Sequence, residues 1–181
     1  YLKEMERLGY ESKYKILNAM DFGIPQNRKR IFVVSILGQN DFDFEALKKA
    51  ETRSIDDFLQ KGVSDFYEVR QESMLRYLSG NPKNKNFKGR LKIIDKYAYT
   101  ISTKQVRVPN SGLVDIGNGK YRYLTERECL RLMGFDDEDF DNIRAIYSKR
   151  PGKTSSILYK QAGNSIVVNV LEAILNEIYR R

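Results

Sequence analysis

The sequence predicts an α/β fold that carries a β-rich insert, and three observations lead to this prediction. Residues 31–37 (IFVVSIL) form an unbroken apolar run, as in a strand buried inside a sheet. Apolar residues recur with a helical period from 166 to 179, as in a helix packed on a sheet. Between 81 and 124, short β-prone pieces alternate with Gly, Pro and Asn. The 181 residues are therefore predicted to form one discontinuous α/β domain, 1–56 with 125–181, and an inserted domain at 57–124.

The amino-terminal part is predicted to run from helix to strand to turn to strand. Residues 2–8 carry apolar side chains at helical spacing, and Gly9 ends that helix. Residues 14–17 are typical of a strand. The Gly and Pro within 21–25 mark a turn that leads to the strand at 31–37.

Helical signals resume after an acidic connection at 38–52. Ser54 is placed to cap a short helix, and 71–78 is predicted to be a second helix that Gly80 ends. Within the insert, the sequence Gly-Asn-Gly at 117–119 indicates a hairpin. The strand-prone pieces of the insert are 91–94, 97–103, 113–116 and 121–124.

The carboxy-terminal part begins with a capping box at 125–128 (TERE), which opens a helix that Gly134 ends. The acidic run 136–141 is expected to be a solvated loop. The final helix is expected to have residues 164–165 as its caps. Only two core strands can be assigned, fewer than an open sheet usually has, so we expect the α/β portion to be incomplete.

The positive charge of the chain is concentrated in one stretch. The net charge is +8, and residues 82–107 alone hold eight basic residues and one acid, Asp95. Such a stretch binds polyanions by releasing counterions, although a solvated lysine-rich face has the same composition. Aromatic and small polar residues between the charges favour DNA or RNA as the partner. The basic residues are Lys83, Lys85, Lys88, Arg90, Lys92, Lys96, Lys104 and Arg107.

Composition excludes several classes of chemistry. The chain has no histidine and one cysteine, Cys129, which excludes an intrachain disulfide, a cysteine zinc cluster and histidine general-base catalysis, so we expect no metal site. No window approaches the roughly 18 apolar residues that span a bilayer. No secretory segment follows Tyr1, which predicts a cytoplasmic protein, and the missing initiator Met predicts a trimmed piece.

Three motifs in order carry a family resemblance. They are DFGIPQNRKRIFVV at 21–34, RYLTERECLRLMGF at 122–135 and YKQAGNSIVVNV at 159–170. Together they resemble the last three sequence blocks of the bacterial DNA cytosine-5 methyltransferases, over nearly the whole chain. The resemblance implies the carboxy-terminal portion of a Rossmann-like methyltransferase core, with the family's variable target-recognition domain inserted between the first two blocks.

The catalytic half of that family is not in this sequence. It carries a Gly-rich cofactor turn, a Pro-Cys nucleophile and a Glu-Asn-Val acid block, and none occurs here. Cys129 does not follow Pro, and we expect it to be a packing residue. We therefore expect a fragment or subunit without a catalytic nucleophile, inactive alone, that pairs with an amino-terminal half or self-associates through an exposed apolar patch.

The resemblance implies roles for five residues in the first and third motifs. Arg30 would contact the flipped cytosine and Arg28 would support the site or a nearby phosphate; side chains two apart share one face of a strand. Asn164, Ser165 and Ile166 would contact S-adenosylmethionine. The simpler alternatives are two surface arginines at a strand edge and a plain helix cap. The second motif is expected to be structural.

In the insert, Thr100 resembles the family's threonine that touches the DNA backbone. Arg90 is the residue expected to read a base. The residues expected to contact double-stranded DNA with it are Lys83, Lys85, Lys88, Lys104 and Arg107. The expected function is the recognition and cofactor-completing part of a restriction-modification methyltransferase. A stand-alone DNA-binding module and an RNA-directed member of the family remain alternatives.

Overall fold

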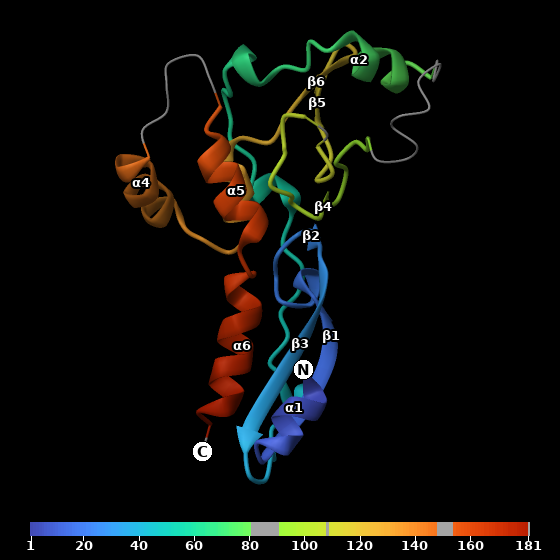
Figure 1. Cartoon of the computed structure of the whole chain (residues 1–181). Helices are drawn as coiled ribbons and strands as arrows, with labels where there is room; N and C mark the ends of the chain where they lie inside the picture. The colour runs from blue at the N-terminus through green and yellow to red at the C-terminus, as the bar shows by residue number, and fades with distance from the viewer. Residues whose placement is uncertain (81–90, 108, 148–153, 181) are drawn as a thin grey trace.

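A computed structural model of the chain describes residues 1–80, 91–107, 109–147 and 154–180. The molecule is elongated and has two lobes (Figure 1). Helices α1 (Leu2–Arg7) and α6 (Val168–Ile178) lie in the lower lobe with a long hairpin, as Figure 1 shows. The remaining α-helices lie in the upper lobe, and the short strands β2 (Gln26–Asn27) and β4 (Ala98–Tyr99) lie where the lobes meet.

The lower lobe is built on an antiparallel pair, β1 (Tyr10–Asn18) and β3 (Lys29–Leu37). Helix α1 precedes β1 and ends as predicted at Gly9, where φ is +82°. The register sets Ile16 opposite Ile31, so the two side chains share one face of the hairpin. The strand predicted at 14–17 lies in the second half of the longer strand β1.

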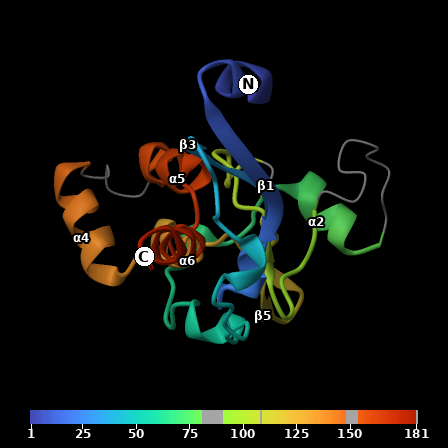
Figure 2. The ribbon, with the colours of Figure 1, turned by 90° about the horizontal axis from the view of Figure 1, so that it is seen from below.

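Helix α6 covers one face of the hairpin. Leu17, Val34, Val170 and Ile174 are buried in a single apolar cluster, which confirms that the final helix packs on the predicted strand layer. Figure 2 shows α6 end-on beside β3.

The prediction that residues 31–37 form a buried strand is wrong for this chain. Of these residues only Val34 is buried, because the face opposite α6 is open to solvent. That face carries the exposed apolar patch that the sequence predicts. Its side chains are Tyr14, Ile16, Ile31 and Leu37.

Helix α3 (Glu126–Arg131) organises the upper part of the main core. Its capping box is formed as predicted, since Thr125 Oγ1 accepts from Glu128 N and the Glu128 carboxylate accepts from Thr125 N. Helix α3 packs against α4 (Asp137–Ile146) and α5 (Ser156–Asn164).

Two helices of this region correct the sequence predictions. The acidic run 136–141 is not a loop but the start of α4, because the Asp136 side chain caps the helix and acidic residues stabilise a helix amino terminus. Helix α5 was not predicted. Because α5 is present, residues 164–165 end that helix and, contrary to the prediction, do not cap α6. The N-cap of α6 is Val167, which makes no side-chain capping hydrogen bond.

The segment from 57 to 124 is less regular than predicted. Its described strands are β4, β5 (Val114–Gly117) and β6 (Lys120–Arg122), and its α-helix is α2 (Glu72–Leu78). Strands β5 and β6 form the hairpin predicted at Gly-Asn-Gly, where Asn118 has φ +52°. A second, small apolar cluster of Val69, Met74, Leu91 and Leu113 supports this segment.

In the described part of the chain, no helix combines the length and the hydrophobicity needed to cross a bilayer.

Candidate functional site

A cavity of about 330 Å³ lies between β3 and the connection from α5 to α6. The residues predicted from the first and third motifs meet there, although they come from opposite ends of the chain. Apolar side chains of the hairpin and of α6 form the rest of its wall. The five predicted residues that line it are Arg28, Arg30, Asn164, Ser165 and Ile166.

The two arginines differ in their surroundings. Arg28 is 7 % exposed, and its guanidinium donates to backbone carbonyls of Ile101 (2.9 Å), Gly163 (3.3 Å) and Ser165 (3.0 Å). Burial, and to a smaller degree the charge of Arg30, lowers the pKa of Arg28 to about 10. Arg28 therefore remains cationic at neutral pH and ties two other main-chain segments, at 101 and at 163–165, to its own.

Arg30 is exposed and donates a hydrogen bond to the neighbouring carbonyl of Lys29 (2.7 Å). Both arginines line the cavity, in agreement with the prediction that they lie on one side of the chain, but they are not equivalent. The guanidinium of Arg30 is the one in a position to meet a bound molecule, because that of Arg28 is committed to protein carbonyls.

Residues 163–166, which we call the turn, are the last two residues of α5 and the first two of the connection to α6. Asn164 and Ile166 are exposed, whereas Ser165 is half-buried and its hydroxyl donates to Gln161 O (2.8 Å). A Cβ on Gly163 would lie 2.4 Å from the amide nitrogen of Thr103. Only glycine therefore allows α5 to approach the segment around Thr103 this closely.

Strands β2 and β4 join the inserted segment to the first motif. They pair in parallel, with Asn27 opposite Tyr99. Thr100, predicted to touch the DNA backbone, donates its hydroxyl to Asn27 O (3.1 Å). A second buried brace is Gln26, which accepts from Ile101 N (3.0 Å) and donates to Leu132 O (2.7 Å). Sequence reasoning missed the role of Gln26.

Part of the predicted DNA-contacting set can be placed in the structure. Lys104 and Arg107 are exposed in the loop that follows Thr100. Gln105 in the same loop is buried and accepts from the Ser111 hydroxyl (2.5 Å), which fixes the base of the loop. The other predicted residues lie outside the described residues: Lys83, Lys85, Lys88 and Arg90.

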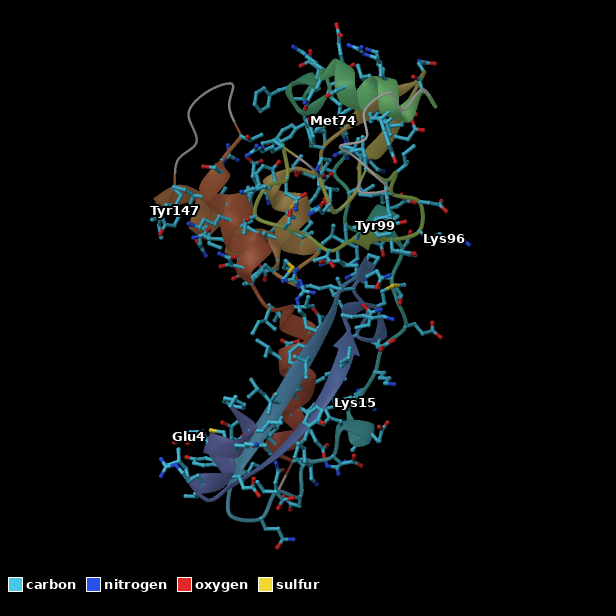
Figure 3. The ribbon with its side chains drawn as sticks, turned by 45° about the vertical axis from the view of Figure 1, so that its right-hand side comes forward. Glu4, Lys15, Met74, Lys96, Tyr99 and Tyr147 are labelled. Carbon is cyan, nitrogen blue, oxygen red and sulfur yellow. The ribbon has the colours of Figure 1, made fainter. Side chains whose placement is uncertain are left out.

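A cluster of aromatic and basic side chains lies beside β4, and the sequence did not predict that these side chains contact one another. Lys92 Nζ lies 4.0 Å from the centroid of the Tyr99 ring, and that ring meets Tyr97 edge-on at 5.4 Å. Tyr99 and Lys96 lie on the same side of the upper lobe in Figure 3, whereas Tyr147 lies on the other side.

The second motif has the structural role expected of it. Arg122 and Glu128 form a buried, two-pronged ion pair with distances of 2.8 and 2.9 Å. Cys129 is fully buried, as expected for a packing residue. Burial, and then the nearby Glu128 and Glu126 carboxylates, raise the pKa of the Cys129 thiol well above its usual value. Cys129 is therefore not a nucleophile.

Comparison with known proteins decides the family. Residues 1–180 match the family model described as C-5 cytosine-specific DNA methylase.

The chain belongs to the C-5 cytosine-specific DNA methylases.

Curated relatives of this methylase family member are bacterial type II methyltransferases. M2.ScrFI of Lactococcus lactis subsp. cremoris is 39% identical, with 99% of this chain and 48% of the relative aligned. M.MspI of Moraxella sp. is 32% identical, with 98% and 40% aligned, and M.HhaI of Haemophilus parahaemolyticus is 29% identical, with 96% and 55% aligned. This methylase chain thus spans about half the length of the relatives it matches.

Solved structures support the same fold. The methyltransferase EhMeth of Entamoeba histolytica has a TM-score of 0.73 at 18% identity, over 98% of this chain and 56% of the other. The Dnmt2 methyltransferase of S. pombe gives the same score and identity, over 98% and 60%. The α/β methyltransferase fold predicted from the sequence is thereby confirmed. The methyl donor implied for a C-5 cytosine methylase is S-adenosylmethionine.

Proposed function

We propose that this chain is the carboxy-terminal, DNA-recognition and cofactor-completing part of a cytosine-5 DNA methyltransferase. The enzyme transfers a methyl group from S-adenosylmethionine to C5 of a cytosine in double-stranded DNA, as part of a restriction-modification system. The single observation that carries this proposal is the cavity in which Arg30 and the turn 163–166 face one another.

The chemistry assigned to Arg30 is charge stabilisation. When a thiolate adds to C6 of cytosine, negative charge develops on the ring and on its O2 atom. A guanidinium fixed at that oxygen stabilises the charge more in the transition state than in the ground state. The target base must leave the duplex to reach such a cavity, as in other enzymes that modify bases. Arg30 is exposed at the cavity, which suits contact with a flipped base.

The residues of the turn suit a ligand that carries an adenosyl group. Ile166 and Val170 offer an apolar wall, and Asn164 offers an exposed amide beside it. When bound, S-adenosylmethionine supplies the methyl group. Asn164, Ser165 and Ile166 hold and orient it in this proposal, and the Gly-rich turn that completes the cofactor site comes from the amino-terminal half.

The nucleophile also comes from the amino-terminal half in this proposal. The sequence has no Pro-Cys pair, and the buried thiol of Cys129 is not available for attack. The open apolar face of the hairpin, with Tyr14, Ile16 and Ile31, is the surface that the rest of the catalytic domain would cover. The amino-terminal half, as part of the same polypeptide or as a subunit, is thus the required protein partner.

The inserted segment provides the DNA contacts in this proposal. Lys104 and Arg107 contact phosphates, and Thr100 touches the DNA backbone. Sequence reading is assigned to Arg90 in the segment 81–90. The charge excess of residues 82–107 supports a polyanion as the partner. The remaining phosphate contacts are assigned to Lys83, Lys85 and Lys88.

A methyl-transfer assay tests the proposal. The chain alone should transfer no methyl group to duplex DNA, and an amino-terminal half with the Pro-Cys motif should restore transfer if the two parts assemble. In the assembled enzyme, Arg30→Ala should lower kcat by roughly 10²–10³-fold with little change in duplex affinity. Methyl transfer by the purified chain alone would contradict the proposal.

DNA binding by the chain is a second test. If roughly five phosphates are neutralised, the slope of log affinity against log salt should be about −4 to −5. Arg90→Ala should relax sequence preference at a cost of about 1–3 kcal/mol, whereas Lys83→Ala should weaken all sequences equally. Competition between duplex DNA and folded RNA for the chain tests the RNA-directed alternative. If the chain binds DNA but the assembled enzyme has no S-adenosylmethionine site, the stand-alone DNA-binding module is favoured.

A further inference from the structure

Three segments that are distant in the sequence meet at Arg28. Its guanidinium donates to Ile101 O in the inserted segment and to Gly163 O and Ser165 O in the turn beside the cavity. Its own amide donates to the Asn18 side chain at the end of β1 (3.0 Å). The side chain therefore connects the segment next to Thr100 directly with the turn.

The same two segments also touch without the help of Arg28. The position of a Cβ on Gly163 lies 2.4 Å from Thr103 N and 2.5 Å from the carbonyl carbon of Ser102. Main chain therefore packs on main chain, with no flexible side chain between. A displacement of one segment must displace the other.

One buried oxygen at this junction, Ser102 Oγ in the inserted segment, lacks a hydrogen-bond partner among the described residues. Buried polar atoms are normally paired, so the unpaired hydroxyl makes this arrangement less favourable than one that pairs it. The junction therefore has a reason to adjust when a ligand restrains either side.

We propose that Arg28 is a positioning residue that couples DNA contact at the Thr100–Thr103 segment to the order of the cofactor turn 163–166. This inference rests on the proposed function, since it takes that segment as a DNA contact. Binding of DNA restrains the segment, and the Arg28 hydrogen bonds and the Gly163 contact pass the restraint to the turn. Because coupling between two sites is reciprocal, a ligand on the turn also favours DNA binding.

Hydrogen exchange on the 181-residue chain tests the coupling. Short DNA duplexes of random sequence at low salt serve as the probe, because phosphate contacts do not depend on sequence. With the wild-type chain, DNA should slow exchange in peptides that cover 98–103 and also in peptides that cover 162–168. The expected slowing at 162–168 is about fivefold or more, the lower range of typical couplings.

Two variants should separate the two effects. In Arg28→Gln and in Gly163→Ala, DNA should still slow exchange at 98–103, but the slowing at 162–168 should disappear. Arg131→Gln is the matched control, since Arg131 also donates from its guanidinium, to Asp137 and to Phe58 O, but away from the junction. This control should behave as wild type.

Each outcome has a defined meaning. Slowing at 98–103 without slowing at 162–168 in the wild-type chain overturns the coupling and leaves the proposed function standing. The coupling is also overturned if both variants bind DNA and still slow exchange at 162–168. If DNA slows exchange nowhere in the wild-type chain, the proposed DNA contact itself fails, and the coupling fails with it. Should Gly163→Ala not fold, the wild type and Arg28→Gln together still decide, because only Arg28→Gln removes the guanidinium hydrogen bonds to Ile101 O, Gly163 O and Ser165 O.

Discussion

The β1–β3 hairpin and the stretch from α3 to Met133 both carry apolar side chains, but the two regions differ in how those side chains are covered. On and just after α3, Cys129, Leu130 and Leu132 are at most 1% exposed, whereas Ile16 and Ile31 on the hairpin are 65% and 62% exposed. The chain itself supplies the surroundings of α3, from α4, α5 and the preceding loops. The hairpin receives cover on one face only, from α6. The upper core is thus covered within the described residues, whereas one face of the hairpin is exposed to solvent.

The largest effect is expected at the ion pair that anchors α3. Glu128→Gln leaves the Arg122 guanidinium buried without its counter-charge, which should lower the free energy of unfolding by about 3–5 kcal/mol. Urea denaturation measures this. The control is Glu72→Gln, which breaks the exposed Arg76–Glu72 pair and should cost at most about 0.5 kcal/mol. If both changes lowered the free energy of unfolding equally, the buried Arg122–Glu128 pair would matter no more for stability than an exposed pair, and the prediction would be wrong.

A pair of truncations compares the two regions directly. Leu132→Ala should lower the free energy of unfolding by about 2–5 kcal/mol, because it opens a cavity in a closed core. Leu37→Ala, on the open hairpin face, should change it by no more than about 0.5 kcal/mol. Thermal and urea unfolding of both variants give the comparison. A large loss for Leu37→Ala would mean that the hairpin face is already covered in solution.

The open face should reveal itself through association more than through stability. Ile31→Lys places a charge on this face, so it should reduce self-association of the chain while changing its unfolding free energy by about 0.5 kcal/mol or less. Sedimentation at several protein concentrations measures the change. Ile146→Lys adds the same charge on α4 and should leave association as it is. Identical sedimentation of both variants and the wild type would count against the hairpin face as a docking surface.

The smallest effect concerns the acidic start of α4. The Arg131 guanidinium lowers the pKa of Asp137 to about 2, below its unfolded value near 3.9. The carboxylate therefore stabilises the fold fully above pH 4, and this contribution is lost as pH falls from about 4 to about 2. Since Asp137 is half exposed, the contribution is below about 1 kcal/mol. In Asp137→Asn, the drop in stability over this pH range should be smaller than in wild type, as chemical denaturation at several pH values would show.

Elements that carry their own local signal could be predicted from the sequence. The capping box at Thr125, the hairpin at Asn118 and the apolar period of the last helix all depend on residues within a few positions of one another. Helix α4 also had a local signal, the capping pair of Asp136 and Asp139. It was missed because a run of acids was interpreted as solvated loop, although acids favour the first turn of a helix.

The burial of the strand at 31–37 and the separate roles of Arg28 and Arg30 depend on residues far away in the sequence, so no local pattern predicts them. The apolar run at 31–37 indicates a strand, but whether both faces are covered depends on surfaces far away in the sequence. At the site, spacing predicted that Arg28 and Arg30 lie on one side of the chain, and in the structure both line one cavity. Spacing could not separate their roles, because the partners of Arg28 are backbone carbonyls at 101, 163 and 165.

The junction between the inserted segment and the core has a consequence for how such proteins diversify. Arg28 and Gln26 hold this segment by the carbonyl and the amide of Ile101, and β2 pairs with β4 through main-chain hydrogen bonds. Groups of this kind are present whatever side chain a position carries. Mutation can therefore change most side chains of this segment while the attachment persists. If the proposed function holds, such changes would alter DNA recognition without altering the residues that line the cavity.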